Sequence, residues 1–389
     1  MVWSRRGFLE SAAACVGRAL ALAPEEELVQ FGDYAPDFAA DAQEANPRVK
    51  SFDLRRLTSV TTPTPEFFAF HQTKTVEADA ATWRLRIGGL VKHPAELSLD
   101  DLRKRPRQKT LISTIECSGN FGDPRIMNGL ISTAAWSGVS LADVLQECTP
   151  NPEAREVVFL GMDSEPDPKW EAGNATYPSP HGWSLYLQDA MAPQHLLAFA
   201  MNGGPLPAEH GFPLRLVMPG WYGMSQIKWL TRIEVIDRPY EGRQKARNYQ
   251  SLRAITSPEG TIWLDSSISR NNLKSVVARV TRRRAGGRFE YKIAGAAWGG
   301  PTSIRAVEIQ IDGGPWLRAT IEQRAGDAAW VLWSMPWREP APGEHVLVSR
   351  AINAGGEVQP TREEMRERRI SNREDNAQWP RTVVIASDR

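Results

Sequence analysis

The sequence has few cysteines and no excess of charge of either sign. Three cysteines occur among 389 residues, at positions 15, 117 and 148, and three cannot form a disulfide framework. Neither a CxxC pair nor an HExxH motif is present, which argues against ordinary zinc chemistry. Lys and Arg number 47 against 46 Asp and Glu, whereas nucleic-acid-binding proteins usually carry a basic domain or stripe. We therefore expect no nucleic-acid partner.

The sequence also lacks long apolar runs. None reaches about 18 residues, so we expect no transmembrane span. Residues 1–25 instead predict a twin-arginine export signal, because Arg5 and Arg6 precede a short stretch of small residues that ends in Ala-Leu-Ala. The prediction is a periplasmic protein. The alternative is an irregular N-terminus with a chance arginine pair.

The length predicts two domains, and 28 Pro, 30 Gly and 14 Trp favour a β-rich chain with many turns. Residues 45–255 combine short strands with two helices capped by Ser98 and Ser140, which predicts an α+β domain. Gly, Pro, Asp and Asn between 161 and 182 predict a long surface loop. Short alternating strands over 260–389 predict a β-sandwich of immunoglobulin-like size.

Cys117 is the most informative residue of the first domain. It follows an apolar strand at 111–115, in the loop Glu116-Cys117-Ser118-Gly119-Asn120. A strand end holds a side chain rigidly while the loop leaves it accessible, which suits a nucleophile or a ligand of a soft metal. The alternative is a buried, inert thiol. That alternative is our prediction for Cys148, which falls on the apolar face of the helix capped by Ser140.

Two further sets of residues could form a binding site. His210 and Arg215, in the segment His-Gly-Phe-Pro-Leu-Arg, precede Lys228 and together could clamp an anion. Tyr249 lies in the connection between the two halves, and clefts between domains are common ligand sites. Taken alone, the first set could equally be solvated side chains, and Tyr249 could equally be a residue of the domain interface.

Taken together, these segments resemble the sulfite oxidase family of molybdopterin oxidoreductases, from about residue 60 to the C-terminus. The cysteine loop resembles the family's ECxGN motif, and Gly203–Pro207 followed by HGFPLR resembles its long internal signature. Further matches to the family and to its C-terminal immunoglobulin-like dimerisation domain are at 219–230, 294–298, 312–314, Trp330, Trp333 and 359–360.

The resemblance implies one molybdenum–molybdopterin cofactor per chain, with Cys117 as a sulfur ligand of the metal. Tyr249 would lie beside the metal as a second catalytic residue. The cofactor-binding residues that it implies are His71, Asp163, His210, Arg215, Ser225 and Lys228. The chain shows no haem domain or flavin fingerprint, so the expected electron acceptor is external, such as a c-type cytochrome. The resemblance also implies a homodimer through residues 260–389.

The expected substrate is a small sulfur compound, to or from which an oxygen atom is transferred. Family members that oxidise sulfite carry two arginines where this sequence has Phe70 and Phe121-Gly122, and Arg125 is the candidate replacement. A sulfoxide-type reductase and a sulfane dehydrogenase subunit are alternatives on the same cofactor. A non-catalytic binding protein on this fold is the alternative from another class.

Overall fold

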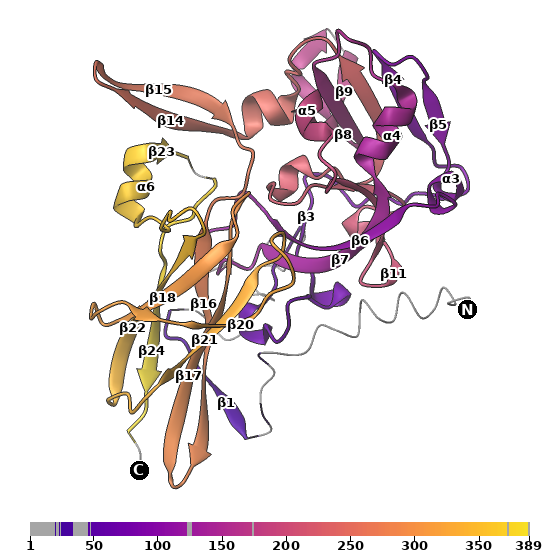
Figure 1. Ribbon diagram of the computed structural model, residues 1–389. Coiled ribbons are helices and arrows are strands. Elements are labelled where there is room, and N and C mark those ends of the chain that lie inside the picture. The colour runs from indigo at the N-terminus through magenta and orange to yellow at the C-terminus, as the bar shows by residue number, and fades with distance from the viewer. Residues whose placement is uncertain are drawn as a thin grey trace.

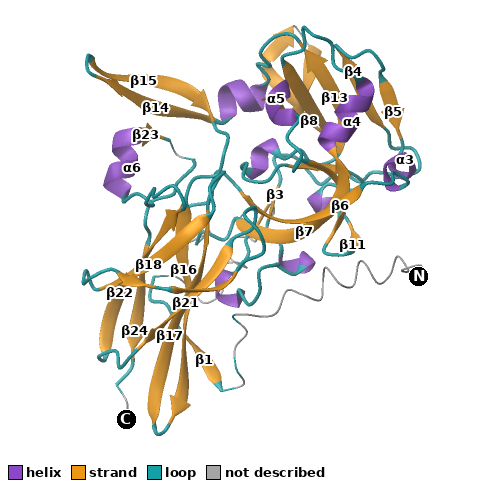
Figure 2. Cartoon of the chain, in the orientation of Figure 1, coloured by secondary structure: helices purple, strands orange, loops and turns teal. Residues whose placement is uncertain are grey.

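The computed structural model describes residues 20, 23, 25–33, 46, 48–122, 127–172, 175–371 and 373–387. The arginine pair of the predicted export signal and Arg125 lie outside the described residues. Strands dominate the chain, and the helices are few and short (Figures 1 and 2). The α+β prediction therefore holds only in a broad sense. No helix of the described residues is long and apolar enough to cross a membrane.

Two sheets build the first half of the chain. One has the order β11-β10-β7-β6, with β12 also paired to β10. The other has the order β5-β4-β13-β8-β9, in which only the β4–β13 pair is parallel. The strands of the first sheet are β6 (Gln108–Glu116), β7 (Ile131–Ser140), β10 (Leu196–Met201), β11 (Gly204–Pro205) and β12 (Arg215–Val217). The strands of the second are β4 (Leu85–Gly89), β5 (Ala95–Leu97), β8 (Glu156–Ala172), β9 (Ala175–Tyr186) and β13 (Leu230–Ile236).

Short helices begin where the sequence provides caps. The Ser98 hydroxyl accepts from the backbone N–H of Asp101 in a capping box, and Ser140 accepts from Asp143. The buried face of the second of these helices includes Cys148, as predicted. The helices are α3 (Leu99–Arg103), α4 (Leu141–Cys148), α5 (Leu187–Ala190) and α6 (Arg362–Arg368). Single 3-10 or π turns span Leu54–Arg56, Thr64–Glu66, Ala208–His210, Gly223–Ser225 and Gln244–Asn248.

The loop predicted for residues 161–182 is wrong, because this segment belongs to the long hairpin of β8 and β9. Antiparallel pairing joins Phe159 to Trp183 in the core and continues to Ala172 and Ala175. The register shifts between Leu160 and Ser164 and again further out. Such irregularities let a strand contain Pro and Gly. By composition alone, these residues indicate a loop.

A two-sheet β-sandwich forms the second half (Figure 1). The first sheet has the order β1-β16-β17-β21-β20 and the second β19-β18-β22-β24. The first contains β1 (Glu26–Val29), β16 (Lys274–Ala285), β17 (Arg288–Trp298), β20 (Thr320–Gln323) and β21 (Val331–Trp337). The second contains β18 (Ile304–Ile311), β19 (Leu317–Arg318), β22 (Gly343–Asn353) and β24 (Pro380–Ile385). Apolar side chains of both sheets, such as Val277, Val307, Trp333 and Leu347, are buried between them.

A shared core joins the two halves. Ile115 and Trp136 from the first half lie in one apolar cluster with Val276, Trp298 and Trp330 of the sandwich. The Trp330 backbone N–H donates to Thr114 Oγ1 at 2.7 Å. The strand that leads to the cysteine loop is therefore packed directly against the sandwich.

Three short pieces complete the fold. β2 (Val49–Lys50) pairs with β3 (Ala69–Phe70). This pairing fixes the position of the segment 67–71, Phe-Phe-Ala-Phe-His. β14 (Gln250–Ser257) pairs with β15 (Gly260–Ser267) in a hairpin that projects from the body, and β23 (Arg369–Ile370) adds to its other edge (Figure 1). This hairpin spans the boundary that the sequence placed between 255 and 260.

Candidate active site

The cysteine loop opens into a pocket lined by residues of the first half of the chain. Strand β6 ends at Glu116, and the Cys117 backbone N–H then donates to the Leu130 carbonyl at 2.9 Å. The Asn120 N–H donates back to the Cys117 carbonyl at 2.9 Å, which closes a tight turn around the cysteine. The half-buried Cys117 lines the pocket. The thiol is thus accessible but rigidly placed, as the strand-end argument predicts.

The other side of this loop is held by a buried ionic network. The Glu116 carboxylate accepts from Trp298 Nε1 at 2.8 Å and from Asn120 Nδ2 at 3.0 Å, and it lies 3.5 Å from Lys274 Nζ. Both charged side chains are only 1% exposed. Burial raises the pKa of Glu116, while Lys274 opposes that shift. Because Lys274 and Trp298 belong to the sandwich, the second half of the chain helps to place Cys117.

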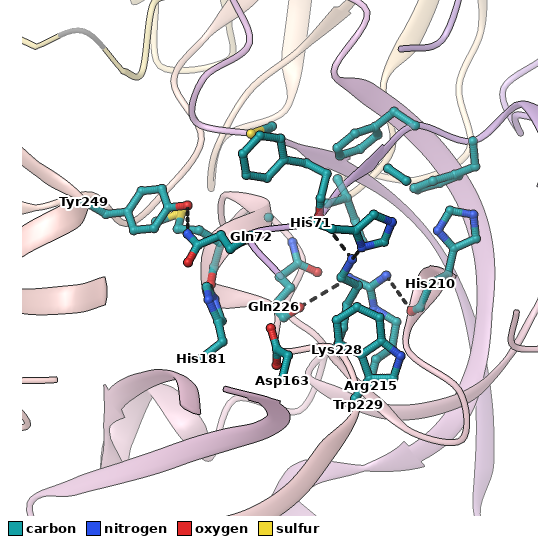
Figure 3. A pocket seen from close by; sticks show the side chains of 18 residues that line it. His71, Gln72, Asp163, His181, His210, Arg215, Gln226, Lys228, Trp229 and Tyr249 are labelled. Carbon is teal, nitrogen blue, oxygen red and sulfur yellow. Dashed lines mark hydrogen bonds between the residues drawn. The ribbon is translucent and has the colours of Figure 1, made fainter. Parts of the chain in front are cut away.

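A cluster of bases forms a second wall of the pocket (Figure 3). Lys228 Nζ lies 2.7 Å from His71 Nδ1 and donates to the Phe70 carbonyl at 3.1 Å. The buried Arg215 guanidinium donates to the carbonyls of His210 and Gln226 at 3.1 and 3.3 Å. Among the described residues it meets no carboxylate, and its Nε has no hydrogen-bond partner. The predicted cation set therefore lies together.

Burial and mutual repulsion shift every base in this cluster. Desolvation, with the charges of Arg215 and Lys228, lowers the pKa of His210 to about 2, and desolvation with Lys228 lowers that of His71 to about 4. Desolvation with Arg215 lowers the pKa of Lys228 to about 7, although Asp163 opposes this shift. Burial lowers the pKa of Arg215 to about 9. Such crowding of like charges is relieved by an anion, so the chemistry of the cluster suits a phosphate.

Tyr249 lies at the far side of the pocket, directly before β14. Its hydroxyl oxygen accepts from Gln72 Nε2 at 2.6 Å (Figure 3). Gln72 Oε1 accepts in turn from Gln244 Nε2 at 3.4 Å. Burial raises the pKa of Tyr249 to about 12, so the phenol keeps its proton at neutral pH. Because the amide donates to the phenol oxygen, the phenol proton remains available for another acceptor.

Arg373 is a residue that the sequence did not predict for this site. Its guanidinium carbon lies 4.5 Å from the centre of the Tyr249 ring. Its charge lowers the pKa of both Tyr249 and Cys117, against the larger effect of burial, which raises both. It comes from the segment 361–375, whose mixture of charges indicates only an exposed stretch. No local pattern marks it, because its partners are distant in the sequence.

The pocket encloses about 710 Å³ of empty space, part of it open to solvent. Most predicted site residues line it: Phe70, His71, Cys117, Asp163, His210, Arg215, Lys228 and Tyr249. The sequence did not predict three polar lining residues, Gln72, His181 and Gln226. His181 Nε2 is bound to the Met224 carbonyl at 2.8 Å. The pocket thus has a basic wall, an apolar wall rich in Phe, and a cysteine between them.

Two predicted residues, Ser225 and Phe121, are not among the residues that line this pocket in the described part of the chain. Ser225 is fully buried and donates its hydroxyl to the Tyr222 carbonyl at 2.7 Å, while its neighbours on both sides line the cavity. Phe121 is half-buried and is not among the described lining residues. At Gly122 a Cβ atom would overlap the Trp379 ring, so no larger side chain fits there. Arg125 lies outside the described residues.

Comparisons with known proteins agree with this geometry. A family model described as "Oxidoreductase molybdopterin binding domain" matches residues 71–244. The chain is 35% identical over 324 residues to mitochondrial sulfite oxidase of Homo sapiens, covering 77% of this chain and 57% of that protein. It is 31% identical over 323 residues to sulfite oxidase of Gallus gallus, covering 77% of this chain and 68% of that protein. The chain therefore spans little more than half the length of the human relative.

A solved structure extends the likeness to nearly the whole chain. The sulfane dehydrogenase SoxCD from Paracoccus pantotrophus superposes with a TM-score of 0.73 at 25% sequence identity. The match covers 93% of this chain and 91% of that one. The β-sandwich is therefore part of the likeness, together with the pocket-bearing half.

Proposed function

Because this chain belongs to the sulfite oxidase family of molybdopterin-binding oxidoreductases, we propose that it transfers an oxygen atom to or from a small sulfur compound. The observation that carries the proposal is that Cys117 and Tyr249 line one pocket with the cluster of buried bases, while Arg373 lies against the Tyr249 ring. In the oxidising direction the sulfur gains an oxygen atom that derives from water and loses two electrons. An external acceptor, for which a c-type cytochrome is suited, takes these electrons.

The residues of the pocket suit a molybdopterin. Its phosphate would place an anion against Arg215, Lys228 and His210, and the orphaned Arg215 Nε would gain an acceptor. Asp163 and His71 would bind the pterin, and the Cys117 thiolate would be the soft ligand of the metal. When bound, this cofactor supplies two-electron redox chemistry at molybdenum.

The chain's own groups then hold the substrate against this centre. Tyr249 enters as a neutral phenol, because its pKa is about 12, and it offers its proton to a substrate oxygen. Arg373 provides a positive charge on the same side. The rings of Phe67 and Phe68 form part of the apolar wall of the pocket.

Sulfite should be a poor substrate of the unmodified protein. Sulfite is a small dianion, and burying it with one guanidinium and the ring of Phe70 leaves part of its charge without a partner. With ferricyanide as acceptor, we expect a Michaelis constant well above the micromolar end of the usual range. We further expect Arg373→Met to raise it about 10- to 100-fold, since a hydrogen bond to a charged group contributes about 1.5–3 kcal/mol.

The matched control is Arg362→Met, which removes a guanidinium that lies 4.0 Å from the Trp379 ring on the exposed α6. This variant should behave as the unmodified protein. Efficient sulfite oxidation at micromolar concentration by both the unmodified protein and Arg373→Met would contradict the substrate proposal.

The alternatives differ in substrate or in direction. A sulfane dehydrogenase subunit is favoured by the likeness to the solved protein of that name. A reduced-dye assay with sulfoxides tests the reductase alternative. Metal analysis of the purified protein tests the non-catalytic alternative, because a binding protein on this fold would hold no molybdenum.

We also propose export to the periplasm, because Arg5 and Arg6 form the arginine pair of a twin-arginine signal in the sequence.

We propose further that the sandwich is immunoglobulin-like and forms a homodimer through residues 260–389. The strand order β16-β17-β21-β20 in one sheet and β18-β22-β24 in the other supports the first point, because it follows the order of an immunoglobulin constant domain. Two-fold dimers are the commonest soluble oligomers. Light scattering at micromolar concentration should give twice the 43.3 kDa chain mass, and a monomeric mass would refute the dimer.

A further inference from the structure

Glu374, the neighbour of Arg373, has an unusual position for a carboxylate. Its side chain is fully buried, and its backbone adopts the left-handed conformation with φ of 59°. Residues other than Gly seldom adopt this conformation, and they do so where the surrounding contacts hold them. The contacts around Glu374 therefore bear on how its neighbour is placed.

The carboxylate of Glu374 is bound to the strand that follows Tyr249. Arg253 Nη2 donates to its two oxygens at 2.8 and 3.0 Å, and Ser251 Oγ donates to one of them at 2.5 Å. Both donors belong to β14, which begins one residue after Tyr249. The ion pair thus ties the segment that carries Arg373 to the strand that directly follows Tyr249.

The backbone of Glu374 is bound to the cysteine loop and to the sandwich. Its N–H donates to the Ser118 carbonyl at 2.6 Å, one residue after Cys117. Its carbonyl accepts from Arg369 Nη2 at 2.6 Å and from Asn272 Nδ2 at 3.1 Å. Three parts of the site, namely the cysteine loop, Tyr249 and Arg373, therefore meet at this one residue.

The pairing of Glu374 with Arg253 also leaves the charge of Arg373 on the side of Tyr249. A buried carboxylate beside an arginine would normally take that arginine as its partner. Here Arg253 neutralises Glu374 from the other side, and the Arg373 guanidinium lies over the Tyr249 ring instead. Among the described residues, no carboxylate forms an ion pair with Arg373.

We propose that Glu374 is the positioning residue of the substrate subsite: through Arg253 and Ser118 it holds the Arg373 guanidinium against Tyr249 and Cys117. This inference rests on the substrate role proposed above for Arg373. Glu374 itself touches neither the pocket nor the reacting atoms and acts only through its neighbour.

The test measures the affinity for sulfate, a redox-inert oxyanion, by isothermal titration of the molybdenum-loaded protein, beside KM and kcat for sulfite. Removal of a negative charge near an anion site would by itself tighten sulfate binding. For Glu374→Gln we expect the opposite, a loss of sulfate affinity of about tenfold or more, because the Arg373 guanidinium leaves its position. Arg253→Met, whose side chain is partly exposed, should weaken sulfate similarly. In both variants KM should rise while kcat changes little.

The control Glu308→Gln breaks the ion pair with Arg350, which lies in the same half of the chain on the sandwich sheet. It should leave sulfate affinity unchanged. Unchanged or tighter sulfate binding in Glu374→Gln and Arg253→Met, with weakened binding in Arg373→Met, would overturn this inference alone. Failure of Arg373→Met to weaken sulfate would overturn the role of Arg373 and this inference with it.

Discussion

Replacement of Cys117 by serine should abolish turnover and leave the fold intact. Serine is similar in shape, and the hydrogen bonds of residue 117 to Leu130 and Asn120 use its backbone N–H and carbonyl and not its thiol. The change nevertheless replaces a soft thiolate by a hard hydroxyl, which molybdenum in a sulfur-rich ligand set binds poorly. Steady-state turnover and the thermal unfolding temperature should be measured on the same preparation.

Cys148→Ser is the matched control. Cys148 is 2% exposed on the inner face of α4, so its serine variant buries a hydroxyl in an apolar core. We expect unchanged turnover per molybdenum and a loss of stability of about 1–3 kcal/mol. Full activity of Cys117→Ser would remove the basis for a metal-ligand role.

Replacement of Arg215 or Lys228 by alanine should lower the amount of cofactor bound per chain. Each cation contributes a charge-assisted interaction of about 1.5–3 kcal/mol to a bound phosphate, so Arg215→Ala and Lys228→Ala should each lower cofactor affinity about 10- to 100-fold. Molybdenum per chain, measured by elemental analysis, reports the loss. Arg232→Ala, which breaks an exposed ion pair with Glu234 on β13, should retain full occupancy.

Both cations also bear on the stability of the cofactor-free protein. The pKa of Lys228 is about 7 and that of Arg215 about 9 in the fold, both below their usual values, so the unfolded chain binds more protons above these pH values. Both charges therefore oppose folding at pH 7, whereas the contacts of the two side chains with the rings of Trp229 and Trp136 favour it. We therefore expect Lys228→Ala and Arg215→Ala to change the thermal unfolding temperature of the cofactor-free protein less than they change cofactor content. Normal molybdenum content in both variants would contradict the assignment.

The chemistry of the site could be predicted from short segments of the sequence. The strand before Cys117 is recognisable from its own residues, because strand patterns are local. It ends at Glu116 and so places the thiol at a strand end. The residues His210, Arg215 and Lys228 meet in one pocket, and the segment that carries His71 and Phe70 reaches the same place. Single residues outside these segments, such as Gln72 and His181, carry no pattern of their own.

The strands of the sandwich were predictable for the same reason, whereas the β8–β9 hairpin was not. Val307–Ile311 has one apolar side chain at every second position, and it lies within β18. The segment 161–182 has turn-forming residues, yet backbone pairing with its neighbour makes it strand. Pairing energy depends on the partner strand, so composition within the segment could not indicate it.

The sequence by itself predicted the cysteine at a strand end and the β-rich second half, because each depends on side chains a few positions apart, whereas the resemblance to the sulfite oxidase family implied the cofactor-binding residues. Only the tertiary structure brought Arg373 over Tyr249 and made Glu374 a link between the cysteine loop and β14. It also excluded any side chain at Gly122, where Trp379 fills the space. These contacts join residues far apart in the chain, and only packing of the sandwich against the pocket places them within a few ångströms of each other.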